Sequence, residues 1–89
     1  MRVEVIKDDE SVAYVTTVSD TAKEAVRIGF NPSQIERVNR LKALAAAFIS
    51  ECEDGQRGSG AAAREYAVAI TNMQTASMWG VLAATKNAP

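Results

Sequence analysis

The sequence predicts an α+β fold, a small N-terminal antiparallel sheet followed by an antiparallel two-helix hairpin, in a chain that forms a homo-oligomer. Apolar residues alternate with polar ones through much of the first thirty positions, which is the period of a β-strand. From residue 33 onward they recur every three or four positions, which is the period of an α-helix. A length of 89 residues gives room for one core. We therefore expect a single domain over residues 1–89, β-rich in residues 1–30 and a helical hairpin in residues 31–86.

Two short strands are expected at the N-terminus. Val3 and Val5 alternate with charged residues, and residues 12–18 place β-branched and aromatic side chains two positions apart. The polar residues 8–11 between these runs are typical of a turn. The pattern therefore predicts a β-hairpin.

Residues 19–30 allow two interpretations. Ser19 could cap a short helix over residues 22–26, or the segment could be a loop that leads into a third strand. We favour the third strand, because apolar residues alternate with Arg27 and Gly29 from position 26 to position 30.

Two candidate caps mark the start of the first long helix. Ser33 stands three positions before Glu36, which is the spacing of a capping box, and Asn31 before Pro32 is a competing cap. The apolar residues that follow form one stripe at helical spacing, which comprises Ile35, Val38, Leu41, Ala45, Phe48, Ile49 and Cys52. We expect this stripe, with the Phe48 ring in it, to face the core.

Charged residues and glycines define the rest of this helix. Its basic residues, among them Arg40 and Lys42, lie mostly off the apolar stripe, and its C-terminal carboxylates are expected to be solvated. The helix is predicted to end near Asp54, because residues 55–60 contain three glycines and indicate a flexible connection.

A second long helix is expected from residues 60–62 to about Lys86. It has no charged residue from Tyr66 to Thr85, and alanines recur in it every seven positions. Hydroxyl and amide side chains at the centre of that span argue against a membrane helix. In so short a chain, an uncharged helix indicates that another subunit covers it. We therefore expect a homo-oligomer and no membrane segment.

The composition excludes several classes of function. A formal net charge of -1 gives no positive field to hold a long nucleic acid. The chain has no histidine and one cysteine, Cys52, which excludes triads with an imidazole base, His/Cys zinc sites and an intrachain disulfide. We expect no enzymatic activity, no metal and no cofactor. The N-terminus lacks the unbroken apolar stretch of a signal peptide, which favours a cytoplasmic protein.

Several basic residues are candidates for binding an anionic ligand. The N-terminus of the first long helix presents free backbone N–H groups, and Arg40 and Lys42 follow within three turns. Arg64 shares a helix face with Thr71 and Thr75, an arrangement that suits a phosphate or a ribose. Structural roles remain open: these charges can solvate a helix face, and Arg64 can pair with a neighbouring carboxylate.

Phe30 offers a flat ring on which a nucleobase could stack. It precedes Asn31 at the expected junction of strand and helix, where side chains and free amides converge. Tyr66 and Trp79 are better explained by packing or by contact between subunits.

The spacing of several short motifs resembles that of a known protein family. Phe30-Asn31-Pro32-Ser33 leads into Val38…Leu41-Lys42-Ala43-Leu44-Ala45-Ala46, then into a glycine loop, and then into Arg64-Glu65…Ala69-Ile70-Thr71…Gln74…Ala76…Met78-Trp79. Over residues 28–86 this pattern resembles the two-helix hairpin domain of phage anti-defence proteins, the Thoeris anti-defence proteins and the anti-CBASS sponges. The strand-rich N-terminus is more similar to the Thoeris type.

The resemblance implies a noncatalytic protein that withholds a cyclic nucleotide immune signal from host effectors in the cytoplasm of an infected cell. The implied ligands are cyclic ADP-ribose isomers or cyclic oligonucleotides, bound between subunits of a homo-oligomer, for which a hexamer built from dimers is expected. By the same resemblance, Phe30, Asn31 and Arg64 are the main candidates for ligand contact. Secondary candidates are Asn39, Arg40, Lys42 and Thr71.

Two other functions remain open from the sequence. One is a regulatory hairpin that has no nucleotide ligand and binds a protein through its uncharged helix face. The other is a small nucleotide-cleaving enzyme, which the lack of histidine and of a supported acid/base pair disfavours.

Overall fold

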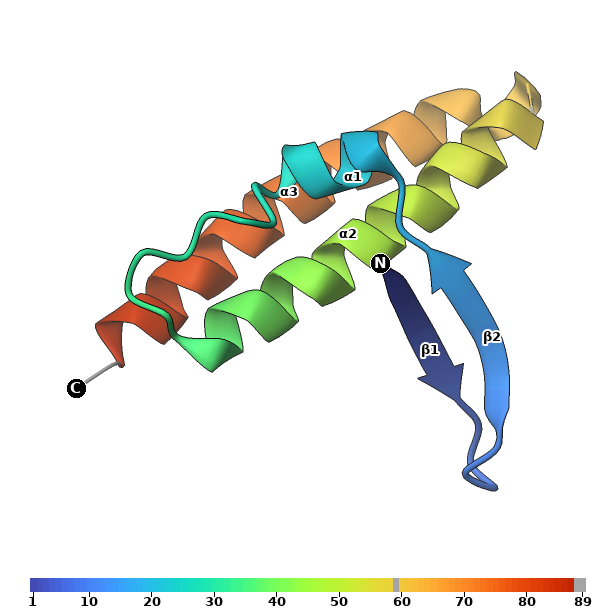
Figure 1. Ribbon diagram of the computed structural model, residues 1–89. Coiled ribbons are helices and arrows are strands. Elements are labelled where there is room, and N and C mark those ends of the chain that lie inside the picture. The colour runs from blue at the N-terminus through green and yellow to red at the C-terminus, as the bar shows by residue number, and fades with distance from the viewer. Residues whose placement is uncertain (59, 88–89) are drawn as a thin grey trace.

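The computed structural model describes residues 1–58 and 60–87 and has the predicted α+β organisation, a two-stranded antiparallel sheet followed by helices. Its elements are β1 (Arg2–Ile6), β2 (Val12–Thr17), α1 (Asp20–Ala25), α2 (Glu36–Gly58), the 3-10 helix η1 (Gly60–Ala62) and α3 (Ala63–Lys86). In Figure 1, α2 and α3 lie side by side as the long body of the molecule, and the β1–β2 hairpin projects away from them. Ser59, which falls in the predicted connection, lies outside the described residues.

The β1–β2 hairpin confirms the predicted pair of strands. The two strands are antiparallel, with an irregularity in the ladder between Val5 and Ile6. The polar turn is closed by Asp9, whose Oδ1 accepts hydrogen bonds from the backbone N–H (3.0 Å) and the hydroxyl (2.6 Å) of Ser11. This is an Asx-type turn, so the turn residues act through their side chains.

Residues 26–30 form a turn, so the favoured prediction of a third strand there is wrong, and the alternative, a short helix capped by Ser19, is present as α1. Ser19 caps α1, because its Oγ accepts a hydrogen bond from the N–H of Ala22 at 3.1 Å. Ala22 and Val26 are both buried and lie four positions apart, which is the spacing of one helix face. The N–H of Arg27 then donates back into α1 at 3.0 Å. The alternating residues therefore lie in a turn, whose backbone hydrogen bonds join residues close in sequence.

Of the two candidate caps, Asn31 makes hydrogen bonds at the start of α2. Its Oδ1 accepts from the N–H of Ile35 (3.3 Å), and its Nδ2 donates to the carbonyl of Ile35 (2.8 Å) and to Oδ1 of Asn39 (3.0 Å). The first of these bonds satisfies an N–H group of the kind that a helix start leaves without an intrahelical partner. The helix itself begins at Glu36.

The helix α2 continues to Gly58, so the prediction that it ends near Asp54 is wrong. Gly55 is helical, and a Cβ placed on it would overlap the ring of Tyr66 on α3. The missing side chain therefore serves close packing between the two helices, and glycine here does not mark a flexible connection. The second long helix begins and ends as predicted, with η1 at residues 60–62 and α3 ending at Lys86.

The core lies where α1 and the end of β2 cover the α2–α3 pair. The buried residues that form it are Val18, Ala22, Val26, Ala45, Ala46, Ala47 and Ile49. Ile70 and Met73 of α3 pack against this cluster. Several of these side chains are small, which lets the helix axes approach closely.

Two residues of α2 differ from the prediction in whether they are buried or exposed. Phe48 was expected in the core and is 45% exposed, whereas Lys42 was expected off the apolar stripe and is only 5% exposed. The buried face of α2 includes Ala46 and Ser50, because the helix is covered by α3 and also by α1 and β2. That second cover rotates the buried face away from Phe48.

Within residues 1–58 and 60–87, no helix is long and apolar enough to cross a bilayer.

We predict that Gly55→Ala destabilises the protein, although alanine is the better helix former. The gain in helix propensity is about 1 kcal/mol, and overlap with the Tyr66 ring costs about 1–3 kcal/mol. Urea unfolding followed by circular dichroism measures the difference.

Gly58→Ala is the matched control, because a Cβ at Gly58 would meet nothing within 4 Å. We expect this variant to be as stable as the parent chain or slightly more stable. Equal stability of the two variants would show that the Tyr66 ring moves aside at no cost.

Candidate functional site

Hydrogen bonds fix the N-terminus of α1 on α2 and thereby place the turn that follows α1. The N–H of Ser19 donates to Oγ of Ser50 at 2.9 Å. The hydroxyls of Ser19 and Thr21 donate to the two carboxylate oxygens of Glu53, each at 2.5 Å. Glu53 belongs to a run that was expected to be solvated, and it serves as an acceptor for another element.

The buried ammonium of Lys42 holds the turn of residues 26–30. Its Nζ donates to the carbonyl oxygens of Arg27 (2.8 Å) and Phe30 (2.5 Å). Burial, and secondly the charge of Arg27, lower the pKa of Lys42 below its usual value. Both carbonyls belong to a turn outside the helices, so the lysine provides partners that regular structure does not. The turn is therefore held on α2 by the two hydrogen bonds of the lysine.

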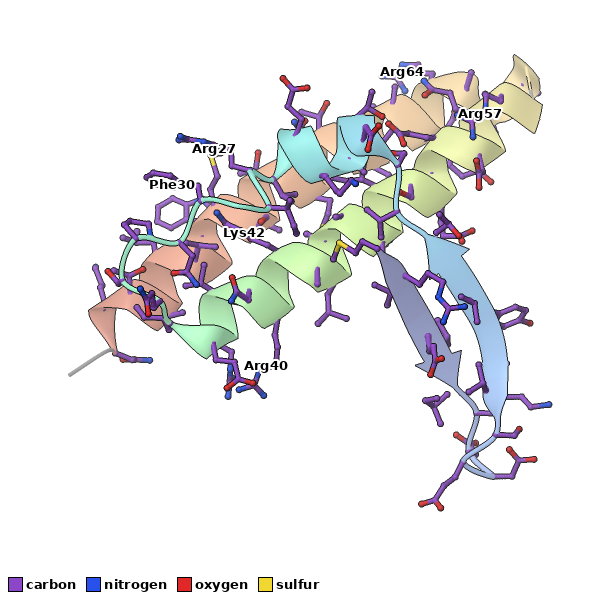
Figure 2. The ribbon with its side chains drawn as sticks, viewed as in Figure 1. Arg27, Phe30, Arg40, Lys42, Arg57 and Arg64 are labelled. Atoms are coloured by element: carbon purple, nitrogen blue, oxygen red, sulfur yellow. The ribbon has the colours of Figure 1, made fainter. Side chains whose placement is uncertain are left out.

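Arg27 and Phe30 form a cation–aromatic pair on the outer side of this turn. The guanidinium carbon lies 4.2 Å from the centre of the Phe30 ring, a distance typical of a cation–π contact. Figure 2 shows both side chains beside Lys42, over the part of the hairpin where α2 faces α3. Sequence reasoning missed Arg27 because the residue was assigned to a strand. Its neighbour Phe30 was the signal that could have identified it.

The pair borders a hollow of about 420 Å³ between the turn and α3. The hollow is lined by Ala25, Val26, Arg27, Phe30, Lys42, Gln74, Ser77, Met78, Val81, Leu82 and Thr85. A smaller hollow of about 240 Å³ lies beside it, around residues 30–33. An apolar wall with a ring, a guanidinium and a few hydroxyl or amide groups suits a ligand that has both a planar part and an anionic part.

Four of the candidate site residues lie together in the structure. Phe30 and Lys42 line both hollows, and Asn31 lines the smaller one. Asn39 is hydrogen-bonded to Asn31 and belongs to the same cluster. Arg40 is exposed and points away from this cluster, on the opposite side of α2 (Figure 2).

Of the two candidates on α3, Arg64 is far from that cluster within one chain. Arg64 is exposed in the first turn of α3, and Figure 2 shows it at the opposite end of the hairpin from Phe30. At the α-helical rise, Arg64 and Thr85 are separated by about 32 Å along the axis. The hydroxyl of Thr71 donates to the carbonyl of Ala67 at 3.2 Å, as its helical position allows.

The described residues contain no cluster of three or more His, Cys, Asp or Glu side chains that could hold a metal ion. Cys52 is buried, and burial together with the nearby Glu51 carboxylate raises the pKa of its thiol. A thiol with a raised pKa forms little thiolate at neutral pH, which matches the inert thiol that the sequence predicts.

Comparison with family models matches residues 21–85 to the family described as "Acb2/Tad1, hairpin domain". The matched segment runs from α1 to α3 and contains the turn, the hollow and Arg64. It covers most of the stretch in which the sequence motifs resemble that family, and it begins a few residues earlier. No curated protein and no solved structure gives a match.

We predict that Cys52 in the folded protein reacts with 5,5′-dithiobis(2-nitrobenzoate) at pH 8 at least ten times more slowly than in urea. Unfolding exposes the thiol and returns its pKa to the ordinary value, so the thiolate fraction rises. Absorbance at 412 nm measures both rates. Equal rates would mean that the thiol is neither shielded nor shifted in the folded state.

Proposed function

The chain belongs to the Acb2/Tad1 hairpin-domain family of phage anti-defence cyclic nucleotide sponges, and we propose that it binds and sequesters such a signal without turnover. The ligand class is cyclic ADP-ribose isomers or cyclic oligonucleotides. Sequestration in the cytoplasm of the infected host would keep the signal from its effector. The proposal also includes a homo-oligomer, a hexamer built from dimers, with ligand pockets between subunits.

One observation carries the proposal: the hollow beside Arg27 and Phe30 lies inside the segment that matches the family. A sponge needs affinity and no catalytic group. The Phe30 ring suits a nucleobase, and the Arg27 guanidinium suits a phosphate. The hollow is open on one side in a single chain, which leaves room for a second subunit to complete it.

The outer face of α3 supports the proposed oligomer. Met78 and Trp79 are 66% and 67% exposed, and Val68 and Leu82 are also exposed. The helix has no charged residue between Glu65 and Lys86, so the exposed apolar side chains on this face are accompanied only by uncharged polar ones such as Asn72 and Thr75. We propose that a second copy of the chain covers the face, because an uncharged helix matches the equivalent face of its own copy without electrostatic conflict.

A twofold pairing of α3 would also explain how the separated candidates act together. The helix spans residues 63–86, so its midpoint lies between Gln74 and Thr75. A twofold axis at that midpoint, with antiparallel helices, brings Arg64 of one chain opposite Thr85 of the partner subunit. Thr85 lines the hollow beside Phe30. Arg64 could then complete a pocket that it cannot reach in its own chain.

The proposed ligand contacts follow from this arrangement. Phe30 and Asn31 contribute from one subunit and Arg64 from the other. Asn39, Arg40, Lys42 and Thr71 are proposed as secondary contacts or supports. Asn39 and Lys42 have hydrogen-bond partners in the cluster, which favours support over direct contact for these two.

The exposed Met78 and Trp79 also favour a second candidate function, docking of a different protein on the same face without a nucleotide ligand. The two functions differ in uptake of nucleotides, so one experiment separates them.

We predict that the purified protein takes up a cyclic nucleotide and releases it intact. The protein is incubated separately with cyclic ADP-ribose isomers, cyclic dinucleotides and cyclic trinucleotides, and free nucleotide is removed by filtration. The protein is then heat-denatured, and the released ligand is identified by mass spectrometry.

Recovery of at least one intact ligand supports the sponge. Recovery of a cleaved nucleotide would establish an enzyme instead. No uptake from any of the three ligand classes would leave the docking module.

We predict that Arg64→Ala weakens nucleotide binding at least tenfold and leaves the oligomer intact. A charge-assisted hydrogen bond contributes about 1.5–3 kcal/mol, which corresponds to tenfold or more in affinity. Isothermal titration measures the affinity, and light scattering measures the mass of the assembly.

Arg57→Ala is the matched control, because Arg57 is an exposed arginine at the same end of the hairpin and pairs with Asp54. We expect it to bind as the parent chain does. Unchanged affinity in Arg64→Ala would remove Arg64 from the pocket, and a parent chain that is monomeric in light scattering would end the shared-pocket proposal.

A further inference from the structure

Arg27 has the geometry of a residue held ready for an external partner. Its backbone adopts a left-handed conformation, with φ of 54°, which a residue with a large side chain rarely adopts. Its side chain is exposed, and its guanidinium is stacked on the Phe30 ring. Stacking fixes the plane of the guanidinium and leaves its N–H groups at the edge of that plane free to donate.

The described part of the chain leaves the charge of Arg27 unpaired. In residues 1–58 and 60–87, the ion pairs are those of Lys23 with Asp20 and of Arg57 with Asp54. Arg27 lines the 420 Å³ hollow, whose other lining is largely apolar. A cation with an unused fork of donors at the rim of an apolar hollow suits a phosphate group on a ligand whose remainder is planar or apolar.

Lys42 determines where Arg27 and Phe30 lie. Its ammonium binds the backbone carbonyl of the residue that carries the guanidinium and that of the residue that carries the ring. The N–H of Phe30 also donates to the carbonyl of Arg27 at 2.9 Å, which closes the turn between the two. Lys42 also lines the hollow, and two of the three donors of its ammonium are used by these carbonyls.

We propose that Arg27 is a ligand-contacting residue that takes a phosphate of the bound molecule, and that Lys42 is a positioning residue that acts through Arg27 and Phe30. The ligand class rests on the proposed function, whereas the positioning of the turn by Lys42 does not. Removing the ammonium would release both carbonyls, and the cation–aromatic pair would lose its fixed place at the rim of the hollow.

The binding experiment uses the full chain and a double-mutant cycle. The probes are cyclic ADP-ribose, cyclic di-AMP and cyclic tri-AMP, and the affinity is measured for each one that the parent chain retains. We expect Arg27→Ala and Lys42→Met each to weaken binding at least tenfold. The affinity of the double variant is expected to lie within about twofold of that of the single variant that binds more weakly, because Lys42 acts through Arg27.

Lys23→Met is the matched control, since it removes one positive charge from an exposed ion pair on α1. It is expected to change the affinity less than twofold. If the fold-losses in affinity of the two single variants multiply in the double variant, Lys42 contacts the ligand itself. That result would overturn its positioning role. Binding unchanged in Arg27→Ala would overturn the assignment of Arg27.

Two measurements do not depend on any nucleotide. Amide hydrogen exchange in the ligand-free protein is expected to be at least tenfold faster at residues 27–30 in Lys42→Met than in the parent chain and in Lys23→Met. In the parent chain, titration with inorganic pyrophosphate is expected to shift the Nε–H resonance of Arg27 more than that of the exposed Arg2 on β1, which has no part in the proposed site.

These readouts separate failure of the inference from failure of the proposed function. Pyrophosphate shifts at Arg27 without uptake of any cyclic nucleotide would support the anion contact and reject the sponge. Equal shifts at Arg27 and Arg2 would show only general attraction of charge and would overturn the contact. Unchanged exchange in Lys42→Met would overturn the positioning role, and the pyrophosphate titration still tests Arg27 if that variant fails to fold.

Discussion

The contact of the Lys42 ammonium with two backbone carbonyls is the interaction on which the candidate site depends. A buried ammonium without acceptors would cost several kcal/mol, and loss of the donor to the Phe30 carbonyl would add to that cost. Each group satisfies the other, so a cation is stable on the buried face of α2. These hydrogen bonds also attach the irregular turn to the helix α2. A turn that belongs to no strand or helix is thereby held against α2.

The parts of the fold that follow from local patterns could be predicted from the sequence. Alternation around Val3 and Val5, with a polar turn after it, is enough for a hairpin, and the three-to-four spacing after residue 33 is enough for two long helices. For residues 19–30 the sequence left a capped helix and a third strand open, because the Ser19 cap is a local signal whereas the bond from Ser19 to Glu53, which holds α1 on α2, spans 34 residues. A bond between such distant residues has no signature in a local window.

The candidate site shows the same division. Phe30 and Asn31 stand in a local motif, so they could be identified, and the structure brings them together with Asn39 and Lys42. The burial of Lys42 could not be predicted from periodicity. A lysine is expected to be exposed unless acceptors for its ammonium are known, and the sequence does not reveal the backbone carbonyls that accept from it. Arg64 presents a different case, because within one chain it is separated from the others by most of the length of α3. The pocket that we propose between subunits would take its residues from separate parts of the monomer.

The contact between Gly55 and Tyr66 has a consequence for how this hairpin can change during evolution. The two positions belong to different helices. A Cβ at position 55 would overlap the ring at position 66, and glycine avoids that overlap because it has no Cβ. Position 55 is the constrained member of the pair, because a Cβ there would meet the ring at position 66. A side chain can arise at position 55 in a descendant only after the aromatic residue at position 66 has become smaller, so the order of substitutions is constrained and the pair should covary.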